Sequence, residues 1–104
     1  MEAKHEERNY RIRISLLGSF SITRTSAGYV NDMYRLVECT VENSKSNGLI
    51  DRYELGQQAA RSRGNHAVYL TLRVEGTDAS KLGVFERMMQ IQFNAQTVRP
   101  GSRR

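Results

Sequence analysis

Residues 10–16 read Tyr-Arg-Ile-Arg-Ile-Ser-Leu, so that large apolar residues at every second position alternate with arginine and serine. This period of two is typical of a strand that buries one face and leaves the other open. The same period returns in residues 67–74, which read Ala-Val-Tyr-Leu-Thr-Leu-Arg-Val. Both stretches therefore predict β-strands with one buried face, and the other elements are assigned around them.

The segment between these two strands begins with a helical period. Apolar residues recur at Val30, Met33, Tyr34, Val37 and Val41. This spacing predicts a helix over residues 29–46, preceded by N-cap candidates in residues 25–28 and ended by a left-handed glycine, Gly48. A strand is the alternative for residues 35–41, where polar and apolar residues also alternate. The length of the segment and its terminal glycine favour the helix.

Two further strands and a second helix complete the pattern. Residues 49–55 predict a second strand, and residues 57–65 predict a polar connection to the third. A short second helix is predicted around Phe85, with Thr77 or Asp78 as its N-cap. Residues 91–97 predict a last strand. That strand would bury Ile91, Phe93 and Ala95 and expose Gln92, Asn94 and Gln96.

The resulting order, βαββαβ, is that of the ferredoxin-like, split βαβ arrangement in the α+β class. We expect a four-stranded antiparallel sheet with two helices on one face and the first and third strands adjacent at its centre. One domain would span residues 1–104, with a core over 9–98, a flexible arm over 1–8 and a basic tail over 99–104. Residues 17–24 are predicted either to extend the first strand or to turn. The predicted core includes Ile12, Ile14, Val37, Leu70, Leu72, Phe85 and Phe93.

Arginine dominates the charge of the chain. The formal net charge is +5, and 13 of the 16 basic residues are arginine. The guanidinium group binds phosphate through two parallel hydrogen bonds and stacks on bases, whereas lysine is a hydrated point charge. The bias towards arginine therefore favours a nucleic-acid partner over an unselected basic surface.

Several functional classes are disfavoured by what the sequence contains. No apolar run approaches the roughly 20 residues of a membrane helix, so no membrane association is expected. One cysteine, Cys39, and two histidines are too few for a structural zinc site, and Cys39 is predicted to be a buried apolar residue of the first helix.

We identify no cofactor motif and no catalytic constellation. Acylphosphatase shares this fold, but its glycine-rich phosphate loop with arginine has no counterpart in residues 17–22. An enzyme is therefore not expected.

Candidate binding residues fall into two sets. The first set is Arg11, Arg13, Tyr69 and Arg73, which alternation assigns to the face of the sheet opposite the helices. Arginines beside a tyrosine on an open sheet are suited to stacking on bases and binding phosphates, and they are equally suited to a protein partner. The second set is Arg61 and Arg63 in the connection and Arg99, Arg103 and Arg104 in the tail. Such arginines typically bind backbone phosphates without reading sequence.

The layout of the chain resembles the small-subunit ribosomal protein six family, in its bacterial and mitochondrial forms. A short first strand carries an aromatic residue, Tyr10, and the first helix ends in a glycine, Gly48, that leads into the second strand. That strand ends in Leu55-Gly56 followed by a polar residue, and the third strand carries a tyrosine, Tyr69. A second helix and a last strand that ends near Arg99 complete the resemblance.

The chain departs from the family at three points. Gln58 stands where the family has arginine, Ala60-Arg61-Ser62 replaces a Leu-Ala-Tyr or Leu-Pro-Tyr signature, and the stretch after the first strand is rich in serine and threonine. Such drift favours a mitochondrial member, with the bacterial cytoplasm and the plastid as alternatives. The resemblance implies a structural component of the small ribosomal subunit that binds small-subunit rRNA and pairs with the eighteenth small-subunit protein. It assigns no RNA contact to the arginines named above.

Two other functions remain open at this point. One is a stand-alone RNA-binding domain of RRM type, although residues 63–69 offer only one aromatic, Tyr69, where that motif needs several. The other is a protein-interaction or ligand-sensing domain that forms a homodimer through its sheet. Binding of short single-stranded RNA would indicate the first, and dimerisation without nucleic acid would indicate the second.

Overall fold

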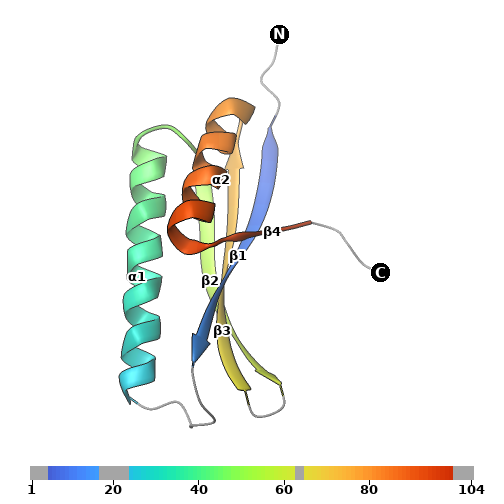
Figure 1. Cartoon of the computed structure of the whole chain (residues 1–104). Coiled ribbons are helices and arrows are strands. Elements are labelled where there is room, and N and C mark those ends of the chain that lie inside the picture. Colours follow the sequence, from blue (N-terminus) through green and yellow to red (C-terminus); the bar gives the residue numbers. More distant parts are fainter. Residues whose placement is uncertain (1–4, 17–23, 63–64, 100–104) are drawn as a thin grey trace.

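The chain folds into one sheet with the strand order β2-β3-β1-β4, in which all neighbouring strands are antiparallel. The computed structural model describes residues 5–16, 24–62 and 65–99. The elements in chain order are β1 (Glu6–Leu16), α1 (Arg24–Ser46), β2 (Arg52–Ser62), β3 (Asn65–Gly76), α2 (Ala79–Phe93) and β4 (Gln96–Val98). Both helices cover the same face of the sheet (Figure 1). The predicted α+β, ferredoxin-like fold with β1 and β3 at its centre is therefore confirmed.

The hydrophobic core lies between this covered face and the two helices. Its buried members are Tyr10, Ile12, Ile14, Val30, Val37, Val41, Ile50, Val68, Leu70, Leu72, Val74, Leu82, Phe85, Met89 and Ala95. Tyr10 packs its ring edge against Phe85 with the centroids 6.1 Å apart. Six of the seven predicted core residues are buried, and Phe93 is only partly buried against the cluster.

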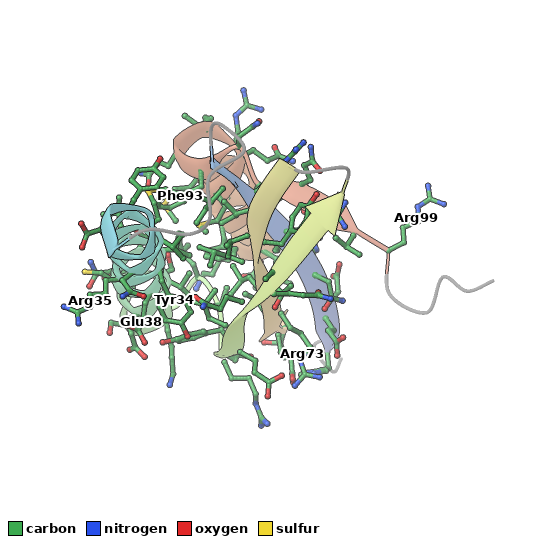
Figure 2. The ribbon with its side chains drawn as sticks, turned by 90° about the horizontal axis from the view of Figure 1, so that it is seen from below. Tyr34, Arg35, Glu38, Arg73, Phe93 and Arg99 are labelled. Carbon is green, nitrogen blue, oxygen red and sulfur yellow. The ribbon has the colours of Figure 1, made fainter. Side chains whose placement is uncertain are left out.

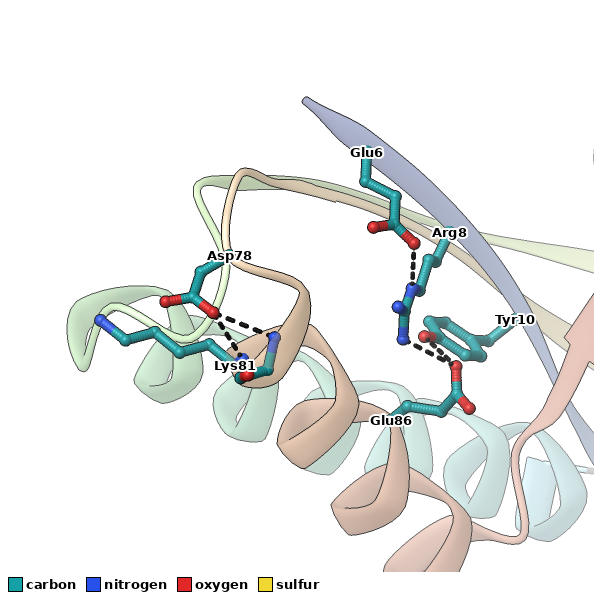
Figure 3. Close-up of polar contacts among 7 residues, drawn as sticks. Glu6, Arg8, Tyr10, Asp78, Lys81 and Glu86 are labelled. Atoms are coloured by element: carbon teal, nitrogen blue, oxygen red, sulfur yellow. Dashed lines mark hydrogen bonds and ion pairs between the residues drawn. The ribbon is translucent and has the colours of Figure 1, made fainter. Parts of the chain in front are cut away.

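A polar cluster joins β1 to α2 at the edge of this core. The Tyr10 hydroxyl donates to the Glu86 carboxylate at 2.9 Å, and the Arg8 guanidinium contacts Glu86 at 3.3 Å and Glu6 at 2.8 Å (Figure 3). Burial of Tyr10, and secondly its bond to Glu86, raises the pKa of the phenol well above its ordinary value. The cluster thus holds α2 against β1, and it gives the hydroxyl of the buried Tyr10 a hydrogen-bond partner.

A second polar contact set joins α1 to β2. The Tyr34 hydroxyl donates to the Leu55 carbonyl at 3.1 Å, and the Tyr53 hydroxyl donates to Glu42 at 2.7 Å. Partial burial, followed by the bond to Glu42, raises the pKa of Tyr53 to about 12. These bonds hold the helix over the edge strand of the sheet.

The helix ends follow local chemistry. Gly48 follows α1 at a φ of +83°, the left-handed conformation that its predicted role requires. The Asp78 carboxylate accepts from the backbone N–H groups of Ser80 and Lys81, so Asp78 is the N-cap of α2 as predicted (Figure 3). Asn94 has a φ of 55° and ends α2, its N–H bonding to the carbonyls of the last turn.

Two predicted N-terminal boundaries are wrong. β1 begins at Glu6 rather than Asn9, because residues 6–8 of the supposed arm pair with β3 and Arg8 finds charged partners. α1 begins at Arg24 rather than near residue 29, so the predicted caps in residues 25–28 lie within its first turns. Residues 17–23 lie outside the described residues, so the prediction that residues 17–24 either extend the first strand or turn is not tested there.

Two predicted strands also change their bounds. β2 spans Arg52–Ser62 instead of residues 49–55, because backbone pairing with β3 continues through residues predicted as a polar connection. The predicted strand over 91–97 is wrong in its first half, where α2 continues to Phe93. Ile91 is accordingly 73% exposed rather than buried, whereas Ala95 is buried as predicted. A short run of alternating apolar residues does not distinguish the end of a helix from a strand.

The prediction for Cys39 is wrong as well, because this residue is exposed on α1. Cys39 lies two positions from both Val37 and Val41, so it is on roughly the opposite side of the helix from these buried residues. Among the described helices, none is both long enough and apolar enough to cross a membrane.

Candidate functional site

The face of the sheet opposite the helices, here called the open face, is formed by every second residue of the strands. In the register, Arg13 and Gln58 flank Tyr69, and Arg11 and Gly56 flank Thr71. The open face also includes Glu7, Asn9, Arg52, Glu54, Arg73, Glu75, Gln96 and Val98. The predicted members Gln92 and Asn94 do not belong to it, since the former lies in α2 and the latter ends that helix.

Arg11 and Tyr69, two of the predicted site residues, contact each other. The Arg11 guanidinium carbon lies 4.8 Å from the centroid of the Tyr69 ring. The residues are diagonal neighbours across the central pair of strands, since Arg13 lies directly opposite Tyr69. The cation is attracted by the negative face of the ring. The guanidinium therefore lies over one face of the ring.

Acidic partners compensate two other arginines of the open face. Arg73 contacts Glu54 at 2.8 Å, and both side chains are largely exposed. Arg52 contacts Glu75 at 3.7 Å, and Glu75 also lies 2.9 Å from His5. Exposed pairs of this kind contribute little stability, and their main consequence is to reduce the local positive charge.

The open face is consequently mixed in charge. Its described arginines are Arg11, Arg13, Arg52 and Arg73, and its described glutamates are Glu7, Glu54 and Glu75. Among the described residues, no ion pair involves Arg11 or Arg13. The positive charge that is available to an anionic partner therefore lies on β1, beside Tyr69.

A hollow of about 650 Å³ occupies the centre of the open face. Gly56 and Thr71 lie at its floor, and a Cβ atom on Gly56 would lie 3.3 Å from the Thr71 hydroxyl oxygen. The other residues around the hollow are Glu7, Asn9, Tyr10, Arg11, Glu54, Leu55, Gln58, Leu72, Arg73 and Val98. This volume lies within the range of about 300–1,000 Å³ that is usual for small-ligand sites.

The predicted site residues are only partly brought together. Arg11, Arg13, Tyr69 and Arg73 share the open face as expected, and Arg99 follows β4 at the edge of the sheet. Figure 2 shows Arg73 and Arg99 on the side of the molecule away from α1. Arg61 lies near the far end of β2, opposite His66 and beyond the pair formed by Gln58 and Tyr69. Arg63, Arg103 and Arg104 lie outside the described residues.

The contribution of β2 to the open face is absent from the predicted site. Glu54, Gly56 and Gln58 lie beside the β3 residues of the first candidate set. The prediction ended this strand at Leu55 and placed Gln58 in a connection. Tyr53 and Leu55 alternate with Glu54 and Gly56, but Gln57 breaks the alternation, so the sequence gives no clear signal that the strand continues.

On the open face, Tyr69 offers a ring for stacking, Arg11 and Arg13 offer guanidinium donors, and Asn9 and Gln58 offer amide groups. These are groups that bind a ligand or a macromolecule through stacking and hydrogen bonds. Comparison with protein-family models, with curated proteins and with solved structures found no match to this chain.

Proposed function

We propose that the protein is a structural component of the small ribosomal subunit that binds small-subunit rRNA through its open face. The resemblance in layout to the ribosomal protein six family suggests this role, and the ferredoxin-like fold of the chain is compatible with it. By the same resemblance the protein acts together with a neighbouring small-subunit protein, the eighteenth. The drift of its motifs favours a mitochondrial ribosome.

The observation that carries the proposal is the Arg11–Tyr69 contact beside Arg13. The carbon of the Arg11 guanidinium lies 4.8 Å from the centroid of the Tyr69 ring. The two groups together form a surface on which an unpaired base can stack. Arg13, which follows on the same face of β1, supplies a charge for a neighbouring phosphate. Single-stranded parts of a folded rRNA present unstacked bases next to backbone phosphates.

The test is binding of small-subunit rRNA fragments across a salt series, with and without the candidate partner protein. Each phosphate contact releases condensed counterions, so affinity should fall steeply with salt. Arg13→Ala should reduce the slope of log affinity against log salt by up to ~1 unit. Arg35→Ala is the matched control, because it removes the same charge from the side of α1 away from the sheet (Figure 2).

Two results would reject the proposal. One is an affinity for rRNA fragments no higher than that of an unrelated protein of equal charge, with and without the partner. The other is an equal loss for Arg13→Ala and Arg35→Ala, because a binding surface on the sheet requires the two to differ. Sedimentation of the tagged protein with small subunits from its native cells is the independent check.

A homodimeric interaction domain is the second candidate, and the mixed charge of the open face favours it. Arg73 with Glu54 and Arg52 with Glu75 form exposed pairs beside the exposed apolar side chain of Val98. Arginine and tyrosine are also frequent anchors of protein interfaces. A stable dimer in the absence of nucleic acid, measured by light scattering, that Tyr69→Ala dissociates would favour this second function.

A further inference from the structure

The hollow of the open face is a slot lined by residues of all four strands, and its row of smallest side chains crosses β2 and β3. Gly56 and Thr71 are register partners on β2 and β3, and they form a row of small side chains. The rows on either side contain larger residues, namely Glu54 with Arg73 and Gln58 with Tyr69. Because same-face residues of a strand repeat about every 6.6 Å, the two flanking rows lie roughly 13 Å apart. The row of Gly56 and Thr71 is therefore open between two higher walls.

Flat groups form both walls of the slot. On one side the Arg73 guanidinium meets the Glu54 carboxylate at 2.8 Å. On the other side the lining includes Gln58 and Arg11, and the Arg11 guanidinium lies over the ring of Tyr69, which is itself outside the lining. Arg11 belongs to the same row as Thr71, but its contact with Tyr69 directs the guanidinium towards the neighbouring row. A planar guest can stack against such surfaces.

The charges around the slot favour a neutral guest. The lining contains two arginines, Arg11 and Arg73, and two glutamates, Glu7 and Glu54. These formal charges cancel, and a phosphate group inside the slot would meet both carboxylates. The remaining polar lining groups are the Asn9 and Gln58 amides and the Thr71 hydroxyl, which both donate and accept hydrogen bonds. A heteroaromatic ring with donors and acceptors on its edge matches this set.

We propose that the slot at Gly56 binds one unpaired base of the RNA, while Arg13 outside it contacts the backbone. This assignment rests on the proposed RNA binding and adds to it a base-binding subsite with Gly56 and Thr71 as its floor. Gly56 is essential to the subsite because any side chain at this position would rise from the floor into the slot. A Cβ atom at position 56 would lie only 3.3 Å from the Thr71 hydroxyl oxygen.

The experiment separates bases from phosphates by using two probes. The first is a fluorescent ten-nucleotide adenosine RNA, and the second is an abasic ribose-phosphate chain of the same length and charge. The wild-type protein should bind the first about tenfold more tightly, as expected when one base stacks. Gly56→Val should abolish this preference and leave binding of the abasic chain unchanged. Arg13→Ala should weaken binding of both probes.

Two variants guard against loss of folding as the explanation. Thr71→Val keeps the shape of the side chain and removes the hydroxyl, so it should reduce the preference with little structural change. Gly83→Ala is the control for replacing a glycine, because a Cβ at this helical position meets no atom within 4 Å. It should bind both probes as the wild type does.

The outcomes distinguish this inference from the function on which it rests. Equal wild-type affinity for the two probes, or a preserved preference in Gly56→Val, overturns the base-binding subsite and leaves phosphate binding by the open face intact. Failure to bind either probe or the rRNA fragments removes the proposed function and the subsite with it. Loss of protein-partner binding in Gly56→Val with unchanged RNA affinity also overturns the inference and assigns the slot to a protein side chain.

Discussion

The covered face and the open face of the sheet are built by the same strands but differ in how far their side chains are buried. On the covered face, neighbours such as Leu70 and Leu72 are almost wholly buried beneath the helices. On the open face, Thr71 and Arg73, which alternate with them, are exposed. The difference teaches that a shift of one position along β3 separates buried from exposed side chains, and paired substitutions can test how far each face contributes to stability.

The largest effect is expected for Leu72→Ala compared with Arg73→Ala. Leu72 is 1% exposed within the core, so its truncation should lower the free energy of unfolding by about 2–5 kcal/mol. Arg73 loses only an exposed ion pair with Glu54, and its replacement should cost under about 1 kcal/mol. Chemical denaturation of both variants measures the contrast. Equal losses would mean that the two faces are wrongly assigned.

An intermediate effect is expected where a polar group enters the covered face. Tyr10→Phe removes the hydroxyl that donates to Glu86, and it should lower the free energy of unfolding by about 1–2 kcal/mol. The control is Tyr69→Phe, which removes a hydroxyl from the open face and should change stability very little. Denaturant unfolding at neutral pH measures both, and a greater loss for Tyr69→Phe would contradict the comparison.

The same buried hydroxyl gives the covered face a dependence on alkaline pH. The pKa of Tyr10 is raised by burial, and that of Tyr53 is raised to about 12, against an unfolded value near 10. Above pH 10 the unfolded chain releases phenolic protons that the folded chain retains, so stability should fall as the pH rises from 10 towards 12. The double variant Tyr10→Phe and Tyr53→Phe should lose less stability over this window. An unchanged slope would disprove the role of these phenols.

The smallest effect is expected for the Arg73–Glu54 pair of the open face. A double-mutant cycle with Arg73→Ala and Glu54→Ala should give a coupling of about 0.2–1 kcal/mol at low salt. Salt should reduce this value, because both side chains are exposed. The cycle is evaluated from denaturant unfolding at two salt concentrations. A coupling above that range and insensitive to salt would show that the open face is more rigid than this comparison assumes.

The central strands are the part of the fold that the sequence predicts best. Tyr10, Ile12 and Ile14 alternate with arginines because one face of β1 packs under the helices and the other does not. Burial enforces this period, so it is visible without a structure. The same alternation correctly assigns Arg11, Arg13, Tyr69 and Arg73 to one face.

The ends of elements are predicted less well, because backbone pairing there does not require apolar side chains. β2 continues beyond Leu55 through polar residues whose hydrogen bonds to β3 are made by the main chain. At the other end of the chain, α2 continues to Phe93 and ends at the left-handed Asn94, and Ile91 is exposed because it lies within this last part of the helix. Neither feature produces a hydrophobic period.

The candidate site is only half predictable for a related reason. Residues of one strand can be assigned to a face, but the partners that a second strand brings depend on register. The register of β2 places Glu54 beside Arg73 and Gly56 beside Thr71, which neutralises one arginine and opens the slot. Since a slip of one residue would reverse every side chain of β2, this arrangement becomes visible only in three dimensions.

The central position of β1 has a consequence for the order in which the protein folds. Glu6 pairs with Gly76 and Asn9 pairs with Val98, so the first strand to be synthesised joins the sheet through the most distant partners. β2 and β3 are consecutive and can form a hairpin locally, whereas β1 must wait for both of its neighbours. We expect pulse-labelled hydrogen exchange to protect the β2–β3 hairpin before β1. Simultaneous protection of all strands would contradict this order. On the ribosome, β1 would then stay without its full set of partners until Val98 has left the exit tunnel.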